Sequence, residues 1–492
     1  MKAPMLSFTM RTLALRRGRL LDPVRVAELQ RRRLRSLVRR AVEGTAFYRE
    51  KYRGIDPDRF TLADLPPTNK GELMANFDRA VTDPEVSRAG LVRFMDDPAN
   101  ADRLYLGRYV ASHTSGSQGQ PLLLIQDERC VELFFGLQMT RGNSEPVNVG
   151  TALRHLFRPK RLAVVTLKRG LYPSATLFQH MPASVRRYVD LLWISQTDPD
   201  MVERLNAFRP RILTGYAGIL EILALEAEAG RLRLAPELRQ VVSNSEALTD
   251  RAKARIESAF GLHTMNNYAT GECPFLSNGC PTDDGAHVNA DRAILEVVDH
   301  DYRPVPDGTP GSKVLITNLA NAAQPIIRYE VGDVVTMADV PCRCGSRLPR
   351  VARIGGRAAD VFWVGEGRRR RQMVNMVLSH AFEYLRDVRE WQAIQTAPDR
   401  ILVRLEPLPG ATLDLASSRP AVDRELALHD FQDVRVDFEV VPRLSPDPAT
   451  GKFRRMISQL GRASGPSPVG VEDGLGLDPI SAASKAAAPA RH

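Results

Sequence analysis

Residues 211–246, "RILTGYAGILEILALEAEAGRLRLAPELRQVVSNSE", contain two short apolar runs with a longer helical run between them. "RILTGY" predicts a strand, "AGILEILALEAEAG" predicts a helix that ends at Gly230, and "LRQVVSNSE" predicts a second strand. Strands that alternate with helices indicate βαβ units, and such units build parallel sheets. This stretch therefore predicts an α/β fold.

The same alternation continues on both sides of this stretch. Residues 161–167 ("RLAVVTL") predict a strand and residues 199–210 predict a helix. On the carboxyl side, residues 249–261 predict a helix and residues 262–272 predict a strand that leads into a loop. We expect these strands to join one parallel sheet.

The remaining segments differ in pattern from this alternation. Residues 24–53 show helical spacing and predict a helix that stops at Gly54. From about residue 291 the chain is β-rich, and residues 358–463 predict a small α+β domain. The tail after residue 463 is rich in Ala, Ser, Gly and Pro, which predicts disorder.

Length and composition narrow the classes of function. The chain has 492 residues, so more than one domain is expected. Its 68 basic and 58 acidic residues leave a net charge of +10, and aromatic residues make up only 6%, which does not favour a nucleic-acid surface. No apolar run approaches the ~20 residues of a membrane span. These features predict a cytoplasmic protein; its arginine-rich start predicts a solvated helix face, with a membrane-surface or acidic-partner role as the alternative.

Residues 112–126, "SHTSGSQGQPLLLIQ", place a glycine-rich loop between two strand-like runs. The small residues of this loop are Thr114, Ser115, Gly116, Ser117 and Gly119. Glycines permit unusual backbone angles, and hydroxyl and backbone donors can bind phosphate closely. The spacing does not fit a Walker loop, which needs a Lys after its second conserved Gly. Taken alone, the loop predicts either an anion cradle or a flexible hairpin.

Five motifs in this order resemble those of the adenylate-forming (ANL) superfamily of acyl-CoA synthetases. The loop is similar to that superfamily's phosphate-binding loop, T-S-G-[ST]-[TS]-G-x-P. The other four motifs are "NNYATGE" (266–272), "RYEVGD" (328–333), "GGRAAD" (355–360) and "PDPATGKFRR" (446–455). Within the superfamily, "TAFYREKY", "LPPTNKGEL" and the cysteine-rich middle of the chain resemble the phenylacetate–CoA ligase and CapK branch.

The resemblance implies an acid–thiol ligase that uses ATP, Mg²⁺ and coenzyme A. A carboxylic acid, with an aromatic acid as the expected class, would form an acyl-adenylate and release pyrophosphate, and coenzyme A would then take the acyl group. The first alternative is transfer to a carrier protein, an amine or a hydroxyl. The second is a degenerate member that only binds nucleotide. The resemblance also implies a homodimer.

The resemblance also implies roles for individual residues. Lys452 would approach the carboxylate and the α-phosphate, Arg357 would contact ribose or phosphate near the hinge, and Glu272 would bind Mg²⁺. The nucleotide-binding residues would be Thr114, Ser115, Gly116, Ser117, Gly119, Ser245, Glu246, Tyr268, Thr270 and Asp333. Tyr268 would stack on adenine, and Asp333 would accept the ribose hydroxyls. Gln120, Gly271 and Ala359 depart from the usual residues of the family.

The five cysteines predict a metal site better than a disulfide framework, because four of them cluster in the sequence. The proposed ligands are Cys280, His287, Cys342 and Cys344, with Cys273 as the substitute. Three thiolates and an imidazole suit a closed, structural Zn²⁺ site, and members of the CapK branch have a similar arrangement. Free thiols and a surface histidine are the alternative, and Cys130 is expected to pack in a helix.

The expected domains follow from these boundaries. Residues 1–34 form a helical extension, and residues 35–357 form a large adenylation domain with parallel sheets and a β-rich subdomain. Residues 358–463 form a small, mobile C-terminal α+β lid, and residues 464–492 form a disordered tail. The resemblance covers about residues 35–462.

Overall fold

The computed structural model describes most of residues 14–460. The exceptions within this range are 16, 101, 115–121, 144–149, 151–157, 167–170, 172, 196–197, 246–247, 249, 358–360, 366–370, 375–377, 379–380, 383–384, 386, 409, 429–430 and 445–454. The tail predicted to be disordered thus lies outside the described residues. Among the residues described, no helix combines the length and apolar character needed to cross a bilayer.

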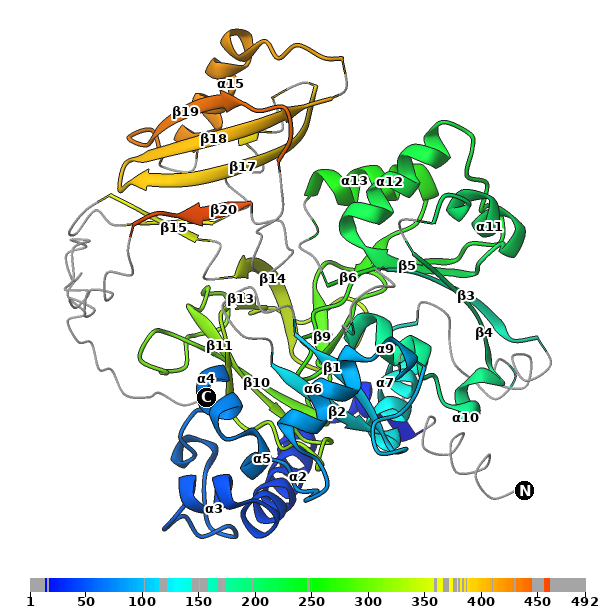
Figure 1. Cartoon of the computed structure of the whole chain (residues 1–492), viewed down its shortest axis with the longest axis vertical. Helices are drawn as coiled ribbons and strands as arrows, with labels where there is room; N and C mark the ends of the chain where they lie inside the picture. Colours follow the sequence, from blue (N-terminus) through cyan, green and yellow to red (C-terminus); the bar gives the residue numbers. More distant parts are fainter. Residues whose placement is uncertain are drawn as a thin grey trace, which may run out of the picture.

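A five-stranded parallel sheet confirms the α/β prediction. Its strand order is β4–β3–β5–β6–β7. The strands are β3 (Lys160–Thr166), β4 (Val189–Ser195), β5 (Ile212–Tyr216), β6 (Gln240–Asn244) and β7 (Thr264–Asn266). The helices α11 (Met201–Phe208), α12 (Ala217–Glu228) and α13 (Asp250–Phe260) lie together against this sheet (Figure 1). Val164, Leu213 and Val241 are fully buried, as expected for strands covered on both faces.

The β-rich part of the chain forms antiparallel sheets. A hairpin of β1 (Tyr109–His113) and β2 (Leu123–Asp127) pairs His113 with Leu123 and so brackets the glycine-rich loop. One sheet contains β10 (Ala293–Val298), β11 (Lys313–Asn318) and β12 (Tyr329–Val331). A second has the order β13–β14–β9–β8, with β8 (Ser277–Gly279), β9 (Ala286–Val288), β13 (Asp333–Met337) and β14 (Arg350–Arg357).

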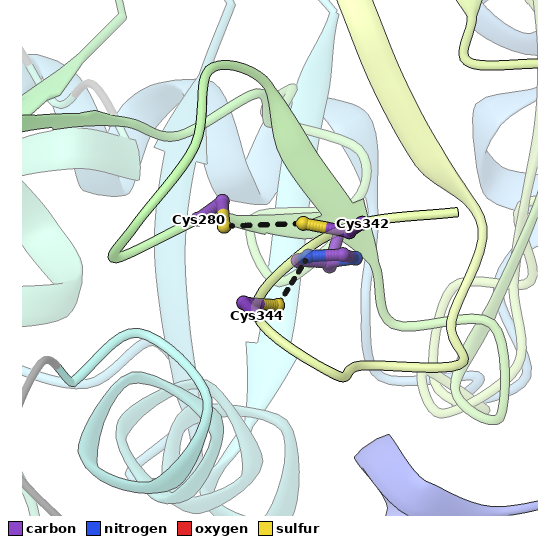
Figure 2. Close-up of side chains that lie close together, drawn as sticks. Cys280, Cys342 and Cys344 are labelled. Atoms are coloured by element: carbon purple, nitrogen blue, oxygen red, sulfur yellow. Dashed lines mark hydrogen bonds between the residues drawn. The ribbon is translucent and has the colours of Figure 1, made fainter. Parts of the chain in front are cut away.

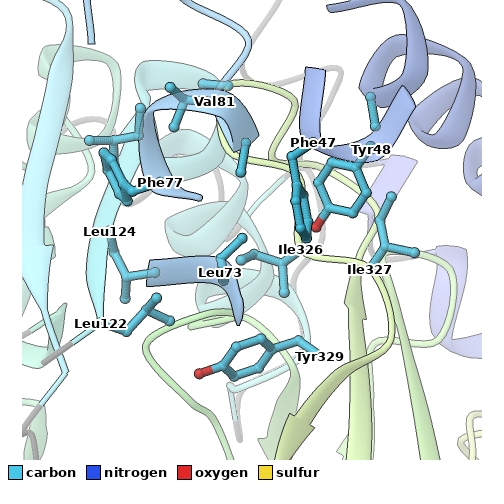
Figure 3. Packing of buried hydrophobic residues seen from close by; sticks show 14 of the residues in the cluster. Phe47, Tyr48, Leu73, Phe77, Val81, Leu122, Leu124, Ile326, Ile327 and Tyr329 are labelled. Atoms are coloured by element: carbon cyan, nitrogen blue, oxygen red, sulfur yellow. The ribbon is translucent and has the colours of Figure 1, made fainter. Parts of the chain in front are cut away.

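The amino-terminal helices pack on this β-rich part. They are α2 (Pro23–Gly44), α3 (Ala46–Lys51), α4 (Lys70–Ala75), α5 (Phe77–Ala80) and α6 (Arg88–Asp96). Figure 3 shows Phe47, Leu73 and Phe77 packed against Leu124 and Ile326. Three further helices are α7 (Glu128–Thr140), α9 (Pro173–Gln179) and α10 (Ala183–Arg186).

The single helix predicted over residues 24–53 is wrong, because the chain forms two helices there. Thr45 has an extended backbone, with φ −135° and ψ 138°, and its side chain accepts a hydrogen bond from the backbone N–H of Tyr48. Thr45 therefore ends α2 and caps the start of α3. Helix α2 runs without a break across residues 34 and 35, where a domain boundary was expected.

The segment before α2 is fastened to the rest of the chain by a buried arginine. The guanidinium of Arg141 donates to the carbonyl of Leu15 and forms an ion pair with Asp291 at 2.6 Å. A Cβ on Gly18 would lie 1.9 Å from Nη2 of Arg141, so a larger residue at this position would displace the guanidinium from these bonds. Arg141 and Asp291 are both almost fully buried, and the ion pair holds the pKa of Asp291 below its usual value against the opposing effect of burial.

The carboxyl-terminal part has a hydrophobic core of its own. Its sheet has the order β19–β18–β17–β20, and β15 pairs with β16 beside it. The elements are β15 (Val361–Val364), β16 (Arg371–Val374), β17 (Val388–Ala397), β18 (Arg400–Pro407), α15 (Leu415–Leu428), β19 (Arg435–Val440) and β20 (Met456–Ser458). The core residues of this unit all lie between Phe362 and Met456. Figure 1 shows β17, β18, β19 and α15 grouped at one end of the molecule.

Candidate functional site

Tyr268 and Asp333, which are 65 residues apart, meet in the structure. The Tyr268 hydroxyl donates to Oδ2 of Asp333 at 3.0 Å. The backbone of Tyr268 is held by Ser277, whose hydroxyl accepts from the Tyr268 N–H at 3.1 Å and donates to its carbonyl at 2.6 Å. Asp333 pairs with Arg357 across β13 and β14, so a third predicted residue reaches the same place through its backbone. The side chain of Arg357 lies outside the described part of the structure.

The turn that carries Glu272 passes against the start of the glycine-rich loop. A Cβ on Gly271 would lie 3.2 Å from Cγ2 of Thr114 and 2.9 Å from Cδ1 of Leu124. Thr114 closes the base of that loop, since its N–H donates to the carbonyl of Leu122 and its hydroxyl accepts from the Leu122 N–H. Glu272 is only 8% exposed. The structure thus places Thr114 and Glu272 in one region, as one nucleotide site requires.

This close approach accounts for the glycine at position 271. Gly271→Ala is expected to destabilise the protein by about 1–3 kcal/mol, because the added methyl group overpacks against Leu124 and Thr114. The measurement is the free energy of unfolding from urea titration. Gly71→Ala is the control. Its added Cβ would lie 3.5 Å from its nearest neighbour, Oδ1 of Asn69, and alanine favours the helix α4 in which Gly71 lies. Equal stability of the Gly271→Ala variant and the unsubstituted protein would show that this contact is not close.

A row of amide side chains, which sequence reasoning missed, fixes β2 against the Glu272 turn. Asn318 donates to the carbonyl of Glu272 at 2.9 Å. Asn321 donates to the carbonyl of Ile125, and Gln324 both donates to Leu123 and accepts from Ile125. The N-x-x-N-x-x-Q spacing of these residues inside an apolar segment was the available signal. Buried amides seldom lack such partners, because leaving them unpaired is costly.

Arg328 is a second residue that the motifs did not single out. It precedes Tyr329 in "RYEVGD", and its guanidinium forms two hydrogen bonds with Glu296, at 2.9 and 3.0 Å. It also donates to the carbonyl of Leu65 at 2.7 Å. These bonds tie the strand before Asp333 to β10 and to the amino-terminal helices.

The other predicted nucleotide residues fall into two groups. Thr270 and Ser245 are described: the Thr270 hydroxyl accepts from the N–H of Cys273 at 3.3 Å, and Ser245 donates to the Asn244 side chain at 2.9 Å. Ser245 has a φ of 64°, a left-handed conformation at the carboxyl end of β6. The predicted residues outside the described part are Ser115, Gly116, Ser117, Gly119, Glu246 and Lys452.

The four predicted metal ligands come together in the structure. Ligand atoms of Cys280, His287, Cys342 and Cys344 all lie within 4.8 Å of one another. Sγ of Cys280 is 3.5 Å from Sγ of Cys342, and Sγ of Cys344 is 3.2 Å from Nε2 of His287 (Figure 2). Cys280 and His287 flank the turn between β8 and β9, while the two other cysteines lie on the loop between β13 and β14. The cluster therefore joins two loops more than 50 residues apart.

The donor set fits a tetrahedral zinc ion. Zn²⁺ prefers thiolate and imidazole ligands, and four of them make a closed, structural site. Nδ1 of His287 is 3.3 Å from the carbonyl of Leu348, which can only accept, so this contact assigns the proton to Nδ1 and leaves Nε2 free as a ligand. Burial disfavours the Cys280 thiolate, but hydrogen bonds with His287, Thr282 and Cys342 lower the pKa of Cys280 to about 6. One thiolate is thus available to a metal at neutral pH.

The remaining cysteines lie outside this cluster. Cys273, the substitute ligand, is fully buried in the hydrophobic core, and burial raises its pKa. Cys130 is buried in α7, as predicted. Neither thiol belongs to the group of four ligand atoms that lie within 4.8 Å of one another.

Proteins of similar sequence or fold include phenylacetate-coenzyme A ligases, protein CapK and 2-hydroxyisobutyryl-CoA ligase. The phenylacetate-coenzyme A ligase of Thermus thermophilus is 30% identical over 164 residues, which cover 32% of this chain and 36% of that protein. Protein CapK of Staphylococcus aureus is 26% identical over 53% of this chain and 55% of its own length. The Escherichia coli phenylacetate-coenzyme A ligase is 25% identical over 69% of this chain and 74% of its own. A solved structure of 2-hydroxyisobutyryl-CoA ligase with 2-HIB-AMP, in its postadenylation state, superposes with a TM-score of 0.67 and covers 90% of this chain and 92% of that one.

The chain has the fold of the adenylate-forming CoA ligases. It is related to their phenylacetate–CoA ligase and CapK branch. The sequence identity to 2-hydroxyisobutyryl-CoA ligase is 21%, so this likeness concerns the fold alone. The chain spans about a third to a half of the length of the first two relatives. No family model matches the sequence.

Proposed function

We propose that this chain activates a carboxylic acid with ATP and passes the acyl group to coenzyme A. The supporting observation is the convergence of motif segments that are far apart in the sequence. Tyr268 bonds to Asp333, the backbone of Arg357 pairs with that of Asp333, and the Glu272 turn passes against Thr114. Relatives named phenylacetate-coenzyme A ligase support the same assignment.

The proposed chemistry has two steps. A carboxylate oxygen attacks the α-phosphorus of ATP, the bond from that phosphorus to the β-phosphate oxygen breaks, and pyrophosphate leaves. The thiolate of coenzyme A then attacks the acyl carbon, and AMP leaves with the electron pair of the broken C–O bond. The first step needs positioning and charge neutralisation more than a protein nucleophile. Asp333 would hold the ribose hydroxyls, Arg357 and Lys452 would neutralise charge near the α-phosphate, and the 114–119 loop would hold the outer phosphates.

Two metal ions belong to this proposal. Mg²⁺ would neutralise phosphate charge, and Glu272 would hold it, because hard cations prefer carboxylate oxygen. Zn²⁺ would be bound by Cys280, His287, Cys342 and Cys344 and would be structural, since all four positions are taken by protein. The zinc ion would link the loop that follows the Glu272 turn to the loop between β13 and β14.

The domain division is part of the same proposal. Residues 35–357 would bind ATP and the acid, and residues 358–463 would form a lid that carries Lys452. The separate core between Phe362 and Met456 and the end of β14 at Arg357 support this division. A rotation of the lid between the two steps would bring different residues to the adenylate, and such a movement can limit turnover.

Tyr268→Phe is expected to raise the dissociation constant for AMP roughly tenfold. The change removes the hydrogen bond by which Tyr268 would orient the Asp333 carboxylate toward the ribose. Hydrogen bonds to charged groups are worth about 1.5–3 kcal/mol. Isothermal titration calorimetry with AMP measures the effect. Tyr302→Phe is the matched control, because Tyr302 also donates to a carboxylate, that of Glu330, at an exposed position in a different part of the chain. If both variants bind AMP like the unsubstituted protein, the orienting role of Tyr268 is wrong.

The function is tested by acid-dependent ATP–pyrophosphate exchange over a panel of aryl, fatty and hydroxy acids. Exchange with at least one acid is expected, and aromatic acids are the expected class. Release of AMP that increases with coenzyme A indicates thioester formation. Exchange without any response to coenzyme A would favour a carrier protein, an amine or a hydroxyl as acceptor. No exchange with any acid would favour a degenerate, nucleotide-binding member.

A further inference from the structure

The exposed side of α2 forms a hollow that is lined mainly by arginines. Its volume is about 460 Å³, and five arginines line it: Arg31, Arg32, Arg35, Arg39 and Arg40. The opposite side of the helix is apolar and buried, so these guanidinium groups face away from the core. Two carboxylates, Glu28 and Asp58, complete the charged lining. The hollow therefore carries an excess of three positive charges.

The two carboxylates do not neutralise the free arginines. Asp58 is paired with Arg39, and Glu28 is paired with Arg25 at 2.7 Å. Within the part of the chain that the structure describes, Arg31, Arg32, Arg35 and Arg40 form no ion pair with a carboxylate. These four side chains are exposed. The cationic groups of the hollow are therefore available to an anion from solution.

This arrangement costs helix stability. Arg31, Arg35 and Arg39 are spaced four residues apart, so they form one row of like charges along α2. Each like-charge pair at this spacing destabilises a helix by about 0.2–0.5 kcal/mol. The fold needs only the buried face of α2, which these residues do not touch. A bound anion would offset the repulsion between these arginines. Exposure of the helix face to water does not bring such an opposite charge.

The size of the row selects the ligand. Each residue of a helix advances about 1.5 Å along the axis, so the unpaired arginines from Arg31 to Arg40 extend over about 14 Å of α2. One carboxylate can occupy one guanidinium fork, whereas a chain of phosphates can engage several. The lining of the hollow consists of charged side chains and Ser36, with no apolar side chain among them.

We infer that the α2 hollow is a binding site for a ligand that carries two or more phosphate groups. It is separate from the proposed nucleotide site, because none of its lining residues belongs to the motifs around Tyr268, Glu272 and Asp333. The ligand is either a soluble polyphosphate compound or a phosphorylated lipid headgroup. Both share the chemistry that arginines recognise, and the experiment separates them.

The test compares three forms of the full chain. The hollow variant carries Arg31→Gln, Arg32→Gln, Arg35→Gln and Arg40→Gln. The control variant loses the same charge at four exposed arginines elsewhere, Arg93→Gln, Arg103→Gln, Arg233→Gln and Arg424→Gln. Inorganic tripolyphosphate is titrated into each form by calorimetry without Mg²⁺. Vesicles of phosphatidylcholine, with and without cardiolipin, whose headgroup carries two phosphates, are sedimented with each form.

The hollow variant is expected to bind tripolyphosphate at least about tenfold more weakly than the control variant, because several charge-assisted bonds are lost. Sedimentation with anionic vesicles, lost only in the hollow variant, would identify a lipid headgroup as the source. Tripolyphosphate binding without sedimentation would identify a soluble ligand. If neither probe distinguishes the hollow variant from the control variant, the site is wrong. Thermal unfolding checks that the hollow variant folds, and unchanged ATP–pyrophosphate exchange separates this result from the proposed function.

Discussion

Glu272→Gln is expected to lower the rate of acid-dependent ATP–pyrophosphate exchange by at least about 100-fold. The substitution keeps the shape of a nearly buried side chain but removes the negative charge that would hold Mg²⁺ beside the phosphates. Removing one group that stabilises developing charge typically lowers the rate by about 10²–10³-fold. The measurement is the exchange rate over a range of Mg²⁺ concentrations. Partial recovery at high Mg²⁺ is expected, because the variant would have lost metal affinity.

The control for this prediction is Glu128→Gln, at an exposed position in the first turn of α7. Both variants lose one carboxylate, and only Glu272 lies on the turn next to Thr114. Thermal unfolding of the two proteins should be similar. Full exchange activity in Glu272→Gln would exclude this residue as the magnesium ligand.

Cys342→Ser is expected to reduce zinc from about one ion per chain to nearly none, and to destabilise the protein by at least about 3 kcal/mol. The free energy of metal binding becomes free energy of folding when the ligands come from separate segments, as Cys280 and Cys342 do. Elemental analysis gives the zinc content, and thermal unfolding with and without a chelator gives the stability. A stable protein that never contains zinc would contradict the site.

The metal cluster should also control the segment before α2. Arg19 donates to the carbonyl of Cys344 at 3.3 Å, and the N–H of Arg347 donates to the carbonyl of Arg19 at 2.9 Å. Loss of the metal frees the loop that makes these contacts, so trypsin should cleave after Arg19 faster in Cys342→Ser. Cys130→Ala, which changes a thiol outside the cluster, should keep both the zinc and the slow cleavage. Equal cleavage in all forms would show that the segment does not depend on the metal.

The sequence by itself predicted the features that are local. The alternation of strands and helices in residues 161–272 depends on the spacing of apolar side chains along one segment, and it predicted the parallel sheet. The proposed zinc ligands were also chosen correctly as a spatial group, since the short spacing of Cys342 and Cys344 already places two thiols together. Ser245, by contrast, was assigned to the nucleotide site by the resemblance alone, and its left-handed backbone just after β6 could not be seen in the sequence.

Only the tertiary structure decided how distant segments meet. It joined Tyr268 to Asp333, pressed Gly271 against Thr114, and excluded Cys273 from the metal group. It also showed which backbone groups the amides of Asn321 and Gln324 bind on β2, because their regular spacing in the sequence does not identify the partners. The physical reason is that these contacts depend on the packing of elements and on the closure of long loops. Neither is encoded in the side-chain spacing of any one segment.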